Sequence, residues 1–179
     1  MSASGESART SLGSAPPPAV STADHVRGEG PEVVVYFDLA CPRCAGIWAR
    51  ITGLPVRLCV RHFPVASKRP RSPALHAAAE AVARQSEEAF WPFWDALLLD
   101  RAHVDDPHLW ERVTRLGLDL GEFDRDRRSD AVRERIRSDF ASGIRAGVTG
   151  TPAAFVGGEQ LHGDLVEALT RIEPYRPRR

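Results

Sequence analysis

The chain contains 179 residues, of which 42% are hydrophobic and 27% are charged, ordinary values for one globular domain. Its 24 basic and 24 acidic side chains cancel, so no overall charge attracts it to nucleic acid or to anionic lipid. No apolar run approaches the roughly 18 residues of a membrane-spanning helix, and three cysteines are too few for a secreted disulfide scaffold. We therefore expect no nucleic-acid partner and no membrane partner, and each cysteine has to be considered separately.

Residues 1–30 differ in composition from the rest of the chain. They contain six serines, three consecutive prolines and no aromatic residue, so they bury too little apolar surface to offset the entropy of ordering. We predict a disordered N-terminal arm over 1–30. The segment also lacks the unbroken apolar stretch of a secretory signal and a twin arginine, so we expect a cytoplasmic protein.

A folded domain is predicted over residues 31–173. Glu32 to Phe37 (EVVVYF) form a β-branched and aromatic run that is typical of a buried strand. Residues 42–51 have helical periodicity, and Pro42 suits the first turn of that helix. A second strand is predicted over residues 55–63, where apolar and polar residues alternate. This order predicts a βαβ unit with parallel strands.

An all-helical insertion is predicted over about residues 66–146. Apolar residues recur there at helical spacing in four segments, and Pro92 is expected in the first turn of the second. Asp106 and Ser129 are predicted to cap the third and fourth helices. After the insertion we predict a short strand at 153–156, a return strand at 160–162 and a last helix at 164–172. Residues 174–179 form a basic tail.

The pair Cys41-Pro42-Arg43-Cys44 lies where the first predicted strand passes into a helix. The partial positive charge of a helix N-terminus favours a thiolate, which is the reactive form of cysteine. Cys41 is therefore expected to be the exposed attacking sulfur, and Cys44 lies on the same helical face, where it can resolve a mixed disulfide. The charge of Arg43 is expected to lower the pKa of Cys41 further.

Two other interpretations of the pair remain open. A structural zinc site needs four ligands, and Cys59 and His62 are the available additional ones, since the chain has no second CxxC. The two cysteines could also be unrelated. The strand–helix context favours a redox pair.

Four segments make the chain similar to the DsbA-like branch of the thioredoxin fold. They are VVVYFDLACPRC at 33–44, RHFP at 61–64, AFWPFWDALL at 89–98 and GVTGTPAAFVGG at 147–158. The resemblance covers roughly residues 32–173. It implies a thioredoxin-like α/β fold (βαβ–ββα) with an inserted helical lobe, and thiol–disulfide oxidoreductase activity.

The resemblance also implies roles for residues outside the cysteine pair. Pro152 matches the family's cis-proline, which faces the cysteines, and Thr151 would offer backbone groups to a substrate peptide. Many thioredoxin-fold enzymes carry a buried acid six positions before the first cysteine, where this chain has Val35. Asp38 matches an acid common in DsbA-like sequences and would tune proton transfer; alternatively, it only caps the strand–helix turn.

The remaining candidate residues are predicted to have structural roles. Cys59, in the second strand, is predicted to act as a small buried hydrophobe. His62 is predicted to be a hydrogen-bonded structural histidine, and the basic loop at 68–71 a solvated surface.

We therefore expect a thiol–disulfide oxidoreductase with Cys41 and Cys44 as catalytic residues. Its substrate would be a protein or small-molecule thiol or disulfide, with an unidentified redox partner. The dithiol carries two electrons itself, so no cofactor and no metal are expected. The alternative is a redox-sensing or metal-binding module without turnover. A glutathione-transferase-like isomerase is disfavoured, because that branch generally lacks the second cysteine.

Overall fold

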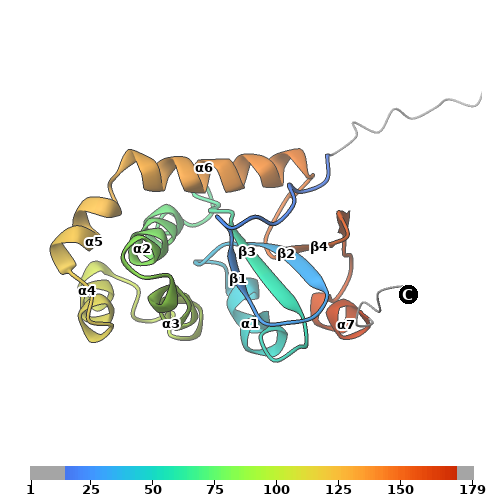
Figure 1. Ribbon diagram of the computed structural model, residues 1–179, viewed down its shortest axis with the longest axis horizontal. Helices are drawn as coiled ribbons and strands as arrows, with labels where there is room; N and C mark the ends of the chain where they lie inside the picture. Colours follow the sequence, from blue (N-terminus) through green and yellow to red (C-terminus); the bar gives the residue numbers. More distant parts are fainter. Residues whose placement is uncertain (1–14, 173–179) are drawn as a thin grey trace, which may run out of the picture.

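A computed structural model describes residues 15–172, which form one mixed sheet and seven helices (Figure 1). The strands are β1 (His25–Arg27), β2 (Glu32–Phe37), β3 (Arg57–His62), β4 (Ala153–Val156) and β5 (Glu159–Gln160). The helices are α1 (Pro42–Ile51), α2 (Ser72–Gln85), α3 (Glu87–Leu99), α4 (Asp106–Arg115), α5 (Leu120–Asp126), α6 (Asp130–Arg145) and α7 (Leu165–Thr170). Within residues 15–172, none of the helices combines the length and the apolar content that a bilayer crossing requires.

The sheet has the order β1-β3-β2-β4-β5. β2 and β3 are parallel, as the βαβ prediction requires, and β4 is antiparallel to β2. Alternate side chains of β2 belong to two separate apolar clusters, because successive residues of a strand point to opposite faces. Val33, Val35 and Phe37 pack with α1, α7 and the helical lobe, whereas Val34 and Tyr36 pack against the opposite side.

The predicted insertion is a lobe of helices α2–α5 beside the sheet, and α6 (orange in Figure 1) leads from the lobe back toward the sheet. Gly143 allows a close approach there, since a Cβ at this position would lie 2.8 Å from the Phe63 ring. The predicted insertion thus contains five helices, α2–α6, one more than the four predicted. The additional helix, α5, has seven residues and buries only Phe123, so it produces no recognisable apolar period.

Pro92 lies inside α3, and its predicted place in the first turn is wrong. Helix α3 begins at Glu87 after Ser86, whose hydroxyl accepts a hydrogen bond from the Ala89 N–H. A proline here removes one intrahelical donor and leaves the Glu88 carbonyl without its usual partner. Both Glu88 and Pro92 are exposed, so water can bind that carbonyl.

The predicted disorder of residues 1–30 is wrong for the part that the structure describes. Strand β1 pairs antiparallel with β3, with His25 opposite Val60. Asp24 is buried and accepts a hydrogen bond from Arg61 Nε at 3.1 Å. The composition did not reveal this order, because the partners of the segment come from a strand about 35 residues further along. Residues 1–14 and the predicted basic tail at 174–179 lie outside the described residues.

Candidate active site

Cys41 is the N-cap residue of α1, and Pro42 occupies the first position of the helix. The extended strand β2 ends at Phe37, and the Cys41 N–H donates to the Asp38 carbonyl at 2.9 Å, which closes the intervening turn. Cys44 lies one helical turn further on and faces the core. The local sequence thus places both sulfurs at the start of a helix, as predicted.

Cys41 is buried, with 1% of its surface exposed, so the expectation of an exposed sulfur is wrong. The segment before β4 covers it, and the Cys41 thiol donates to the Thr151 carbonyl at 3.4 Å. The Thr151–Pro152 peptide bond is cis.

The two thiols differ strongly in acidity. The pKa of Cys41 is lowered to about 5, chiefly by a hydrogen bond from the Cys44 thiol, with help from the Thr151 side chain and the backbone N–H groups of Cys44 and Arg43. Burial raises the pKa of Cys44 well above its usual value, and the neighbouring Cys41 adds to the effect. Near neutral pH the pair therefore consists of a Cys41 thiolate and a Cys44 thiol. Arg43 contributes through its backbone, and its side chain is exposed.

This difference predicts an acid-shifted thiolate titration. The ultraviolet absorbance of the thiolate should rise with a midpoint near pH 5 in the reduced wild type, because Cys41 loses its proton there. The Cys41→Ser variant should show no such rise at that pH, since the pKa of Cys59 is raised to about 12 by burial. A wild-type midpoint near the usual cysteine value of about 8.5 would contradict the assignment.

The Asp38 carboxylate is fully buried beneath the turn that leads to Cys41. It accepts hydrogen bonds from the Ala40 N–H at 2.9 Å, the Val65 N–H at 3.2 Å, Ser72 Oγ at 2.5 Å and Arg69 at 3.1 Å. Burial opposes ionisation, but the hydrogen bonds from the Ser72 hydroxyl and the Ala40 N–H hold the pKa of the carboxyl well below its usual range. A carboxylate held by so many donors is a poor proton acceptor, so these contacts favour the capping interpretation.

A buried chain of histidines was not recognised from the sequence. The Leu39 N–H donates to His76 Nε2 at 3.1 Å, so His76 carries its proton on Nδ1 and donates to His62 Nδ1 at 2.6 Å. His62 Nε2 in turn donates to Glu80 at 2.6 Å, and His25 Nε2 reaches the same carboxylate oxygen at 2.6 Å. The chain links the active-site turn to β1. Burial lowers the pKa of His62 to about 3, so this histidine is neutral.

The ligands required by the zinc interpretation do not converge on the cysteine pair. Cys59 packs on the opposite face of the sheet from Cys41 and Cys44, and His62 belongs to the buried histidine chain. The donor atoms of His25, His62 and Glu80 lie within 4.8 Å of one another and could hold a metal ion. Their 2.6 Å separations are hydrogen-bond lengths, and Arg135 Nε lies 3.7 Å from the Glu80 oxygen, so the geometry fits a polar network better.

A polar pocket of about 300 Å³ adjoins the Thr151–Pro152 segment. It is lined by Arg43, Val65, Lys68, Arg69, Thr149, Gly150, Thr151, Pro152, Ala153 and Gln160. The basic loop that the sequence indicated as a solvated surface therefore lies beside the candidate active site. Nothing in the local sequence relates this loop to the cysteines.

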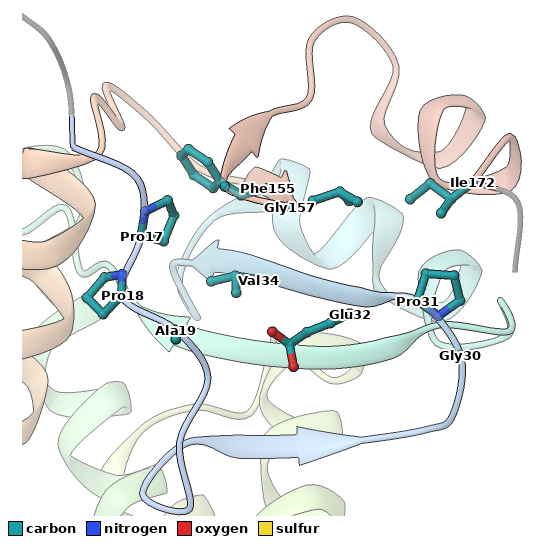
Figure 2. A pocket seen from close by; sticks show the side chains of 12 residues that line it. Pro17, Pro18, Ala19, Gly30, Pro31, Glu32, Val34, Phe155, Gly157 and Ile172 are labelled. Atoms are coloured by element: carbon teal, nitrogen blue, oxygen red, sulfur yellow. The ribbon is translucent and has the colours of Figure 1, made fainter. Parts of the chain in front are cut away.

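A larger groove of about 700 Å³ lies on the side of the sheet opposite α1 (Figure 2). Pro17, Pro18 and Ala19 of the N-terminal segment form one wall, and Val34 and Phe155 lie on the neighbouring strands β2 and β4. None of the predicted site residues lines this groove. The candidate active site is thus the smaller pocket at the cysteine turn.

Comparison with known proteins relates the chain to one family. A family model described as "DSBA-like thioredoxin domain" matches residues 47–170, a span that begins just after the cysteine pair. A "thioredoxin-like oxidoreductase" of Silicibacter pomeroyi is 28% identical, with a TM-score of 0.68, over 78% of this chain and 83% of that one. The thiol-disulfide exchange protein alpha-DsbA2 of Wolbachia pipientis is 21% identical, with a TM-score of 0.71, over 80% and 82% of the two chains.

Similar full-length sequences fall into two groups. The "Na(+)/H(+) antiporter NhaA" of Herminiimonas arsenicoxydans is 36% identical over 158 residues, which cover 82% of this chain and 24% of the antiporter. The chain thus spans about a quarter of the length of that relative. The "Probable disulfide bond formation protein D" of Bacillus anthracis is 26% identical over 75% of this chain and 68% of that protein.

Proposed function

Because the chain belongs to the DSBA-like thioredoxin domain family of thiol–disulfide oxidoreductases, we propose that it exchanges disulfides through its own Cys41–Cys44 pair. The observation that carries this proposal is the acidity difference within the pair: Cys41 at the helix N-terminus has a pKa of about 5, whereas burial keeps Cys44 protonated. One sulfur is thus prepared to attack and the other to resolve.

The exchange proceeds in two steps. The Cys41 thiolate attacks one sulfur of the substrate disulfide, forms a mixed disulfide and releases the other substrate sulfur as a thiolate. Cys44 then loses its proton to the released thiolate or to water and attacks Cys41. The Cys41–Cys44 disulfide forms, the second substrate thiol leaves, and two electrons have passed to the substrate. The reverse sequence oxidises a substrate dithiol, so the redox partner sets the direction.

Thr151 and Pro152 are proposed to hold the substrate. The Thr151 carbonyl contacts the Cys41 thiol at 3.4 Å, so an extended substrate segment that pairs with this backbone would bring its disulfide to Cys41. Asp38 positions the turn on which Cys41 lies, through its hydrogen bond from the Ala40 N–H. Pro42 starts the helix without leaving an unpaired N–H beside the sulfurs.

The proposal is tested by a redox titration of the wild type. We expect a reversible Cys41–Cys44 disulfide and catalysed reduction or oxidation of a disulfide substrate. The Cys41 pKa of about 5 lies between those of thioredoxin (~7) and DsbA (~3.5), so the reduction potential should fall between about −270 and about −120 mV. Stoichiometric metal that is lost in Cys41→Ser, with no catalysed exchange, would instead support a metal-binding module.

A further inference from the structure

Three positive side chains line one pocket beside the candidate active site. Arg43, Lys68 and Arg69 line the 300 Å³ pocket beside Thr151 and Pro152, and none of the lining residues is acidic. The whole chain is neutral, and Lys68 is its only lysine. We call these three side chains with Thr151 the cationic pocket. Its charge is a local property that the overall balance conceals.

Asp38 connects this pocket to the cysteine turn. Its Oδ1 accepts the Ala40 N–H on the turn, and its Oδ2 accepts the Val65 N–H at the start of the basic loop. The Val65 carbonyl then accepts the N–H groups of Lys68 and Arg69, both at 3.0 Å. One buried carboxylate therefore connects the turn of the attacking sulfur to the loop that carries Lys68 and Arg69.

Two of the three cations are available to a ligand. Arg69 lies 3.1 Å from the Asp38 carboxylate, which offsets its charge. Arg43 and Lys68 are exposed, and neither forms an ion pair with any residue in the part of the chain that the structure describes. The pocket thus offers two positive charges beside Thr151, whose carbonyl oxygen lies 3.4 Å from the Cys41 sulfur.

We propose that the cationic pocket binds a carboxylate of the substrate, so that the enzyme prefers disulfides that carry negative charge close to the reacting sulfur. This inference rests on the proposed function and adds the substrate class to it. A cleft lined by charge of one sign raises the local concentration of oppositely charged ligands. The ligand chemistry is a carboxylate near the disulfide, whether on a small molecule or on an acidic peptide.

The test compares three aliphatic disulfides that differ in charge. They are 3,3′-dithiodipropionate, which is anionic, hydroxyethyl disulfide, which is neutral, and cystamine, which is cationic. Each rate with the reduced protein is divided by the rate with free dithiothreitol, to remove differences in intrinsic reactivity. We expect the normalised rates to decrease in that order, with about a tenfold difference between the extremes that shrinks at high salt.

Variants of Lys68 test whether a preference for the anionic disulfide arises from the cationic pocket. Lys68→Glu should remove or reverse the order of the normalised rates, and Lys68→Gln should reduce the preference without reversing it. Lys68 is exposed, so neither change disturbs the core. Arg115→Glu is the control, because Arg115 is a 70% exposed side chain on α4 and the substitution alters the net charge equally. The Arg115→Glu protein should show the same order and the same spread of normalised rates as the wild type.

The outcomes separate this inference from the function on which it depends. If the wild type exchanges none of the three disulfides, the proposed function fails. If it exchanges all three at equal normalised rates, the function stands and the cationic pocket has no role in selection. Disulfide-linked peptides with Glu or Gln beside the cysteine identify the source of the carboxylate. A preference for Glu peptides indicates acidic protein segments, and a preference limited to dithiodipropionate indicates small thiols.

Discussion

Replacing Cys41 with serine should reduce disulfide exchange to the uncatalysed background, whereas replacing Cys44 should stop the reaction after its first step. A serine hydroxyl forms no disulfide, so Cys41→Ser removes the attacking group altogether. Cys44→Ser retains the Cys41 thiolate but removes the sulfur that resolves the mixed disulfide. We therefore expect a covalent adduct of the substrate on Cys41, visible by mass spectrometry and lost on reduction.

A second substitution at position 44 separates resolution from acidity. A hydrogen bond from Cys44 is the main reason for the low pKa of Cys41. Cys44→Ala should therefore trap the adduct and also raise the midpoint of the Cys41 titration. Cys44→Ser keeps a hydroxyl donor at position 44, so it should shift that midpoint less. Cys59→Ala is the matched control, since Cys59 lies on the opposite face of the sheet, and its exchange rate should equal that of the wild type. Retained catalysis in Cys41→Ser would refute the mechanism.

Asp38→Ala should be the most destabilising single change at the site, with a loss of about 3 kcal/mol in the free energy of unfolding. The carboxylate is 0% exposed and accepts from Ala40, Val65, Ser72 and Arg69. An alanine leaves the two backbone N–H groups and the hydroxyl without acceptors, and each unpaired buried group costs about 1–3 kcal/mol. Denaturant unfolding at neutral pH measures the change.

Asp38→Asn is the matched variant for this prediction. It keeps the shape and one oxygen acceptor, so it should lose about half as much stability as Asp38→Ala. Ser72→Ala removes a single donor and should lose about 1 kcal/mol. An Asp38→Ala protein as stable as the wild type would show that the carboxylate does not hold the turn and the basic loop together.

The Asp38 contribution should also depend on pH. The folded-state pKa of this carboxyl lies below its unfolded value of about 3.9, so the folded protein binds fewer protons than the unfolded chain. Its stabilisation is therefore fully present above about pH 5 and is lost as the pH falls through the folded pKa. The difference in unfolding free energy between the wild type and Asp38→Asn should be constant near neutrality and narrow below pH 4.

Much of the fold could be predicted because its signals are local. The β-branched run at 32–37, the proline after Cys41 and the cap at Ser129 act within one turn or one strand, whereas the cap of α4 is Asp105 and not the predicted Asp106. The extra helix α5 and the internal position of Pro92 were missed for the opposite reason. One depends on a single buried phenylalanine, and the other is tolerated because its side of α3 faces water.

The order of residues 15–30 could not be predicted from their composition. Asp24 and His25 are polar residues that a local criterion assigns to solvent, yet the side chains of both are buried. Their partners, Arg61 and Glu80, lie 37 and 55 residues away in the chain. The packing of β1 against the β3 edge supplies these partners, and the polar groups then stabilise the segment instead of opposing its burial.

The sequence by itself determined the candidate dithiol of this protein: two cysteines one helical turn apart, at the end of a strand and the start of a helix. Only the tertiary structure decided what surrounds them. It brings Thr151, 110 residues further on, onto Cys41, and it ties the loop of Lys68 to the same turn through Asp38. The physical reason is that helix ends and strands follow from neighbouring residues, whereas burial and charge at a sulfur depend on chain segments that only folding brings together.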